Sequence, residues 1–173
     1  AELSADQLAW PTKGPHGEDS GKWKRLHYHT WTVDEAGLNN AWSLMYAGVG
    51  YCNDPIAQIN SRDISAMGIT QQEKDSYLSE LKLLRAFHYL KLMDLFGGVP
   101  IQTEPGDPLN PVYPSTSSRK EVFDFVEKEI KDNINNVPKL SRAQLGRMSQ
   151  ASGYAMLVEL YLNAEVWSGT ARW

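Results

Sequence analysis

One segment in the middle of the chain constrains its fold more than any other. Residues 83–96 carry apolar or aromatic side chains on nearly every side of a helix, and Gly97-Gly98-Val99-Pro100 follows directly. A helix that is apolar all round has to be buried. Glycine permits the left-handed backbone that commonly ends a helix, and proline cannot continue one. The segment predicts a central buried helix that ends at Phe96, with structural roles for Gly97, Gly98 and Pro100.

Helical periodicity continues on both sides of this segment. Thr70 with Glu73, and Ser118 with Glu121, have the spacing of capping boxes, which begin helices. A further helix is expected after Asp34, with the apolar stripe Leu38, Ala41, Trp42, Met45, Val49, Cys52, Ile56 and Ile59. The helix that begins at Ser118 is expected to bury Val122, Val126, Ile130, Ile134 and Val137 and to end at Pro138.

Two positions in this pattern carry specific expectations. Pro55 lies inside the first apolar stripe, so that helix is expected to kink or to be capped again there. The last helix is expected to begin near Ser149. Its predicted inward face consists of Ala151, Tyr154, Ala155, Val158, Tyr161 and Leu162.

The pattern as a whole predicts an all-α protein, because no segment alternates between polar and apolar residues as a strand would. Small residues beside large aromatic ones favour antiparallel helix pairs with tetratricopeptide-like packing and long irregular loops. A simple helix bundle fits the pattern equally well. We expect an N-terminal loop region over residues 1–33 and a helical repeat-like domain over residues 34–173, forming one compact domain overall.

Composition excludes several classes of function. The net charge is −4 and basic residues cluster only at residues 22–25, which argues against nucleic-acid binding. The single cysteine, Cys52, cannot form an internal disulfide and is expected to be a buried, inert thiol. No apolar run is long enough to suggest a membrane span, and residues 1–6 do not look like a signal sequence.

Candidate catalytic or metal-binding groups are sparse. His27 and His29, with His16 nearby, could share a zinc ion, but the chain lacks the further ligands at a suitable spacing. We therefore expect no metal, no cofactor and no enzymatic activity. Arg85 lies inside the most apolar helix, where it has to be paired with a carboxylate of a neighbouring helix or with loop carbonyls. Its predicted role is structural.

Aromatic residues in loops are the better candidates for a site. Residues 8–32 are rich in Gly, Pro and Trp, and residues 103–117 contain four prolines. Trp and Tyr side chains stack on the C–H faces of sugar rings, and pockets combine such walls with a few polar groups. Trp10, Trp23 and Tyr113 are the predicted ligand-binding residues, whereas Trp31 and Trp42 are expected to lie in the core.

Four blocks, in order, carry a resemblance to a known family. They are Pro11-Thr12-Lys13-Gly14 followed by residues 23–31; residues 40–49 with Cys52-Asn53; Leu84-Arg85-Ala86 through Phe96-Gly97-Gly98-Val99-Pro100 with Thr103; and Gly146-Arg147-Met148 leading into residues 155–164. Together they resemble the SusD/RagB family of nutrient-binding outer-membrane lipoproteins. Members of that family are about three times as long, so the chain resembles their N-terminal portion, and Pro55 departs from the family pattern.

The resemblance implies a function that the residues alone do not reveal. It implies non-catalytic capture of glycans, or of other oligomeric nutrients, on the extracellular face of the outer membrane. The expected partners are an oligosaccharide ligand and a SusC-like TonB-dependent transporter, with membrane contact only through a lipid anchor that this chain lacks. The alternative is a helical-repeat adaptor that binds proteins and has no soluble ligand of its own.

Overall fold

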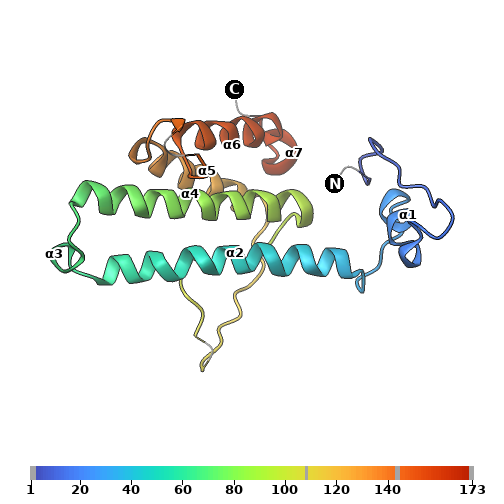
Figure 1. Cartoon of the computed structure of the whole chain (residues 1–173), viewed down its shortest axis with the longest axis horizontal. Helices are drawn as coiled ribbons and strands as arrows, with labels where there is room; N and C mark the ends of the chain where they lie inside the picture. Colours follow the sequence, from blue (N-terminus) through green and yellow to red (C-terminus); the bar gives the residue numbers. More distant parts are fainter. Residues whose placement is uncertain (1–2, 108, 143–144, 172–173) are drawn as a thin grey trace. The chain divides into compact units, whose positions relative to one another are not determined.

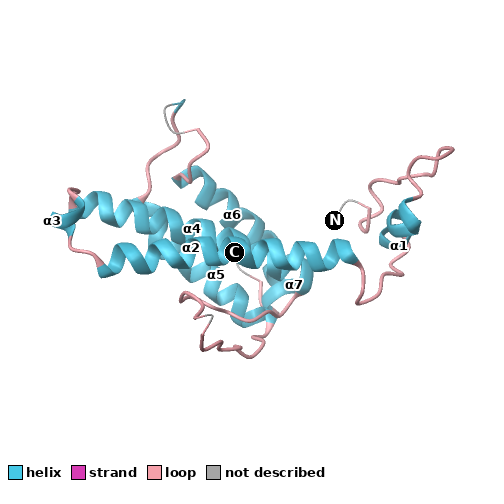
Figure 2. Ribbon diagram, turned by 60° about the horizontal axis from the view of Figure 1, so that its bottom comes forward, coloured by secondary structure: helices cyan, strands magenta, loops and turns pink. Residues whose placement is uncertain are grey.

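The computed structural model describes residues 3–107, 109–142 and 145–171, and these ranges contain helices but no strands (Figures 1 and 2). The predicted all-α class is therefore confirmed. The helices are α1 (Lys22–His27), α2 (Ala36–Ser61), α3 (Ile64–Met67), α4 (Gln71–Phe96), α5 (Arg119–Asn133), α6 (Gln150–Leu162) and α7 (Ala164–Ser168), with short 3-10 turns η1 (Asp19–Gly21) and η2 (Ile134–Asn136). No helix within the described ranges is both long and apolar enough to cross a membrane.

The chain divides into two compact units, residues 1–44 and 45–173, and the division falls inside α2. In the first unit, the Arg25 guanidinium joins α1 to the segment before α2. Its Nε donates to the buried Glu35 carboxylate at 2.7 Å, and one Nη donates to the Ser20 carbonyl at 2.6 Å. The predicted division at residue 33 into a loop region and a helical domain stays a prediction.

Helix α4 is the centre of the second unit. Leu83, Ala86, Tyr89, Leu90, Leu92 and Met93 of this helix are completely buried. In Figure 1, α4 runs antiparallel to the part of α2 that belongs to this unit. Val122, Phe123, Val126 and Ile130 of α5 are also completely buried. Apolar side chains on several sides of α4 thus place it at the core, as the sequence predicts.

Local signals set both ends of α4. The Thr70 hydroxyl caps the helix, and Glu73 completes the predicted capping box. At the other end Gly97 has a φ of +77°, which an L side chain rarely adopts. A Cβ at Gly98 would overlap the Ser117 carbonyl, so the glycine allows the chain to pass close to the start of α5. Ser117 donates its amide to the Val99 carbonyl at 3.1 Å there.

Pro55 does not begin a new, separately capped helix, because α2 continues through it to Ser61. Proline removes the amide that would bond the carbonyl of residue 51. Tyr51 is 79% exposed, so water can reach that carbonyl. The missing bond therefore costs less than it would in the core.

The predicted inward face of α6 is wrong. The helix buries Gly153, Met156 and Leu160, whereas Ala151, Tyr154, Ala155, Val158 and Leu162 are exposed and Tyr161 is half-buried. Periodicity cannot choose between two faces when both are apolar. Gly153 decides the choice, because its missing side chain makes room for Ile134 of η2, which a Cβ would meet at 2.8 Å.

The imidazole of His88 brings α4 close to α2. It packs against Gly48, where an added Cβ would overlap the ring. Gly50, two residues further along α2, has open space around the position of its missing Cβ. The two glycines therefore form a matched pair within one helix.

We expect Gly48→Ala and Gly50→Ala to have opposite effects. Gly48→Ala should lower the free energy of unfolding by about 1–3 kcal/mol, because it overpacks the contact with His88. Gly50→Ala should raise it by up to about 1 kcal/mol, through helix propensity alone. Urea unfolding followed by circular dichroism measures both. Equal stabilisation by the two substitutions would contradict the close contact.

His88 should also make stability depend on pH. Burial lowers its pKa, and its Nδ1 is a buried atom without a hydrogen-bond partner among the described residues. The unfolded chain therefore binds a proton at His88 more readily than the folded chain does. The contribution of neutral His88 to the free energy of unfolding is constant above about pH 6.5, the ordinary pKa of histidine, and is lost as the pH falls below that value. Urea unfolding at several pH values should show that the stability of the native chain falls more steeply between pH 7 and 5 than that of His88→Leu, and equal slopes would contradict this contribution of His88.

Candidate functional site

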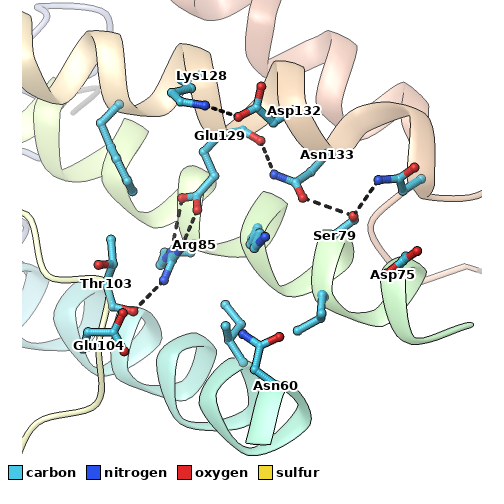
Figure 3. Close-up of a pocket in the computed structure, with 15 residues that line it drawn as sticks. Asn60, Asp75, Ser79, Arg85, Thr103, Glu104, Lys128, Glu129, Asp132 and Asn133 are labelled. Atoms are coloured by element: carbon cyan, nitrogen blue, oxygen red, sulfur yellow. Dashed lines mark hydrogen bonds and ion pairs between the residues drawn. The ribbon is translucent and has the colours of Figure 1, made fainter. Parts of the chain in front are cut away.

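The side chain of Arg85 lies at the centre of the second unit and is 5% exposed. Its guanidinium forms a bidentate pair with the Glu129 carboxylate of α5, in which Nε lies 3.2 Å from Oε2 (Figure 3). One Nη donates to Oδ1 of Asn53 at 2.7 Å and to the Thr103 carbonyl at 2.9 Å. Burial raises the pKa of Glu129, and the facing guanidinium opposes that rise. One arginine therefore joins α2, α4, α5 and the segment that follows α4.

Side chains from α2 and α4 hold the extended segment from Pro100 to Glu104. The Tyr46 hydroxyl donates to the Pro100 carbonyl at 2.7 Å. The Asn53 amide donates to the carbonyls of Gln102 and Glu104 at 3.1 and 3.2 Å. The Tyr89 hydroxyl accepts from the Gln102 amide at 2.7 Å and donates to its carbonyl at 3.0 Å. These bonds satisfy backbone groups that have no sheet or helix to pair with.

A second polar layer lies beside the arginine. The Ser79 hydroxyl donates to Asn133 at 3.1 Å and accepts from Asn136 at 3.3 Å, and Asn133 donates to the Glu129 carbonyl at 2.8 Å. Sequence reasoning missed Asn53 and Asn133. A usable signal was present, since both amides fall in the register of buried apolar residues.

An open groove of about 660 Å³ lies next to these two layers, between α2, α4 and α5. In Figure 3, Asn60, Asp75, Glu104 and Asp132 surround it. Its charges are of both signs, and the buried donors around Arg85 already have protein partners. Among the described residues there is no group of three His, Cys, Asp or Glu side chains that could hold a metal ion. The groove contains no catalytic arrangement.

The first unit contains an aromatic site of a different kind. The rings of Trp10 and Trp23 lie 5.7 Å apart between centroids and are tilted by 40°. Trp10 is 56% exposed and, with Pro11, Lys13, His16 and Gly17, lines a pocket of about 200 Å³. Gly17 has a φ of +78°, and a Cβ there would lie 2.6 Å from the Trp10 indole nitrogen. The glycine therefore allows the loop to close onto the tryptophan.

Polar side chains surround this pair. The Trp23 indole N–H donates to the Asp19 carboxylate, and the Lys22 ammonium lies 4.2 Å from the Trp23 ring centroid. Glu18 accepts from Thr12 at 2.9 Å and from Lys24 at 3.1 Å, and these contacts lower its pKa. A partly exposed aromatic wall with nearby donors and acceptors is the usual composition of a small-ligand pocket.

The remaining predicted residues are distributed differently. Tyr113 is 87% exposed and belongs to the second unit, whereas Trp10 and Trp23 belong to the first. Trp31 is 39% exposed and contacts the His29 ring at 5.3 Å. The prediction that Trp31 lies in the core is therefore wrong, because it follows the turn after α1 and precedes α2. Trp42 is half-buried.

Two histidine side chains of the first unit, those of His27 and His29, form hydrogen bonds to backbone carbonyls. Nδ1 of His27 lies 3.3 Å from the Leu3 carbonyl, and Nε2 of His29 lies 2.6 Å from the Ser4 carbonyl. Cys52 is fully buried, and burial raises the pKa of its thiol to about 11. None of these groups is placed for catalysis.

The described part of the chain is thus an all-helical scaffold with a small aromatic pocket in its first unit. A family model for SusD-like proteins, described as starch-binding and associating with the outer membrane, matches residues 15–162. The chain belongs to this family. It is 28% identical over 125 residues to the starch-binding protein SusD of Bacteroides thetaiotaomicron, and the match covers 72% of this chain and 21% of that protein.

Solved structures show the same fold. A laminarin-binding SusD-like protein superposes with a TM-score of 0.74 at 24% identity, over 86% of this chain and 31% of its own. The surface glycan-binding protein A of Bacteroides uniformis superposes with a TM-score of 0.76 at 24% identity, over 95% of this chain and 37% of its own. The chain thus spans a minor part of the length of each relative.

Arg85→Met should be far more damaging than Arg147→Met. Arg147 pairs bidentately with Glu80, but its side chain is 54% exposed. Removing Arg85 leaves Glu129 buried and unpaired, which typically costs about 3–5 kcal/mol, whereas the loss at Arg147 should be within about 1 kcal/mol. Urea unfolding at pH 7.5 measures both.

The pH dependence of Arg85→Met separates charge from packing. Without the guanidinium, burial alone raises the pKa of Glu129 above its unfolded value. Protonation then stabilises the folded variant at low pH, and this contribution is lost as the pH rises through that pKa. The stability deficit of Arg85→Met relative to the native chain should therefore shrink between pH 7.5 and 4.5. A deficit that does not change with pH would indicate a packing effect.

Proposed function

We propose that this chain is part of a non-catalytic protein that captures glycans at the cell surface and delivers them to a SusC-like TonB-dependent outer-membrane transporter. The observation that carries the proposal is the Trp10–Trp23 pair, with a pocket beside it, in a chain of the SusD-like family. Relatives are named for binding starch, laminarin and surface glycans. A lipid anchor on the extracellular face of the outer membrane belongs to the same proposal.

The pocket suits a sugar in both size and chemistry. At about 200 Å³ it is smaller than the sites that enclose drug-sized ligands, so it suits a single ring of a longer oligosaccharide. The half-exposed Trp10 indole offers a face for the C–H side of that ring. Lys13 and His16 line the same pocket and supply polar groups for its hydroxyls. Such a site binds without any step that breaks or forms a bond.

Tyr113 is the other proposed contact. Its ring is 87% exposed in the loop over residues 103–117, where Val112 is 80% exposed. The base of that loop is held by Arg85 and Asn53 through the carbonyls of Thr103 and Glu104. An exposed aromatic ring in this loop offers a face on which a ligand can stack.

Calorimetric titration of the full-length protein with maltoheptaose and with laminarihexaose tests the glycan function. Trp10→Ala should weaken binding at least ~10-fold, since loss of a central aromatic anchor typically costs about 2 kcal/mol or more, and about 1.4 kcal/mol corresponds to tenfold. Trp23→Ala removes the ring that packs against Trp10, and Tyr113→Ala removes an exposed ring, so each should weaken binding by a smaller factor. Trp31→Ala is the matched control, an exposed tryptophan of the same unit, and should leave affinity unchanged.

Three results would contradict parts of this proposal. Binding that survives both Trp10→Ala and Trp23→Ala would place the glycan site elsewhere on the protein. Co-purification with the transporter in the absence of binding to any glycan would favour the helical-repeat adaptor instead. Hydrolysis of either oligosaccharide would rule out a purely binding role.

A further inference from the structure

The pocket beside Trp10 is built on a two-residue hairpin turn. Lys13 and His16 face each other across an antiparallel bridge, in which the Lys13 amide donates to the His16 carbonyl at 2.9 Å and the His16 amide donates to the Lys13 carbonyl at 3.1 Å. Gly14, the first central residue of the turn, has a φ of +57°, which such turns require at that position. Residues that are directly opposite in an antiparallel pair have their side chains on the same side of the backbone. The turn therefore places the side chains of Lys13 and His16 next to each other, and both line the pocket.

The side chains that line this pocket offer donors more than acceptors. The Lys13 ammonium has three donors and no acceptor, and the His16 ring has an N–H donor in either tautomer. Among the described residues, those that line the pocket include no carboxylate and no carboxamide side chain. The hydroxyls of a neutral sugar both donate and accept, so such a sugar would find few side-chain acceptors here. A carboxylate or a sulfate group only accepts, and it matches this lining more closely.

The charge around the pocket also favours an anion. Residues 10–25 contain four Lys or Arg residues and two Asp or Glu residues, although the chain as a whole has a net charge of −4. The two carboxylates of this stretch, those of Glu18 and Asp19, are already hydrogen-bonded to side chains of the same unit. Neither the Lys13 nor the Lys22 ammonium forms an ion pair within the part of the chain that the structure describes. The positive charge beside the aromatic pair is therefore not neutralised by the protein.

We propose that this pocket binds an acidic sugar, whose ring stacks on the Trp10 indole and whose carboxylate or sulfate group is bound by Lys13 and His16. The inference rests on the proposed glycan function and names the class of sugar that the site takes. The acidic group lies at the edge of the sugar ring, so it can reach side chains beside the indole while the ring covers the indole face. A hydrogen bond between charged groups is stronger than one between neutral groups. The site thus favours an acidic ring over a neutral ring of the same shape.

Two matched pairs of oligosaccharides test this proposal. Calorimetric titration of the full-length protein at pH 7.5 compares hexagalacturonate with its methyl ester, and sulfated laminarihexaose with laminarihexaose. In one pair or both, the acidic oligosaccharide should bind about 10-fold more tightly than its neutral partner, the gain expected for one hydrogen bond between charged groups. The pair that shows the preference identifies the acidic group as a carboxylate or a sulfate ester. Added salt should reduce the preference, because it screens the exposed ammonium.

Substitutions of lysine assign the preference to the pocket. Lys13→Met should abolish it, whereas Lys13→Arg should retain it because a guanidinium also donates to an anion. Lys139→Met is the matched control, since it removes the same charge from an exposed lysine of the second unit, and it should keep the full preference.

The failure of this inference can be told apart from the failure of the glycan function. Neutral oligosaccharides that bind as tightly as their acidic partners would overturn the inference and leave the glycan function intact. A preference that survives Lys13→Met, or that Lys139→Met reduces equally, would overturn the role of this pocket in selecting acidic sugars. Failure of every oligosaccharide to bind, maltoheptaose included, would overturn both proposals.

Discussion

The pairing of Arg85 with Glu129 is the interaction on which the rest of the second unit depends. A buried guanidinium cannot lose its charge, so every segment around it has to offer an acceptor. Glu129 of α5, Asn53 of α2 and the Thr103 carbonyl do so, and each comes from a different part of the chain. A buried ion pair adds little net stability compared with apolar packing of the same volume. We infer that its contribution here is to fix the relative positions of three helices and one loop.

The same network explains how an irregular segment can lie against an apolar helix. The chain leaves α4 at Gly97 without entering another helix until Arg119, so its backbone groups need partners from side chains. Tyr46, Asn53 and Tyr89 supply them, and the segment from Pro100 to Glu104 is held in one conformation. Beyond it, Asp107 accepts from the Leu109 amide and from the Asn110 side chain within the loop, and Tyr113 is exposed.

Sequence predicted the features that depend on neighbouring residues and missed those that depend on distant ones. Helix ends depend on neighbouring residues. The structure begins helices at the predicted capping boxes of Thr70 and Ser118 and ends α4 at Gly97, as predicted. The inward face of α6 is not local, since it depends on Ile134 entering the space at Gly153. Because both sides of α6 are apolar, only this distant contact decides which side is buried against the second unit.

The contacts of the candidate site also depend on residues close together in the sequence. The predicted residues Trp10 and Trp23 lie in contact, and they do so through local geometry, because Gly17 folds the loop onto Trp10 and Asp19 binds the Trp23 indole. None of these contacts involves Arg85 or the helices around it. The residues of the proposed ligand contact and the residues that hold the helical core are therefore two separate sets. If the proposed function is correct, substitutions in the aromatic loop can alter the ligand contact without removing any of the bonds that Arg85 makes.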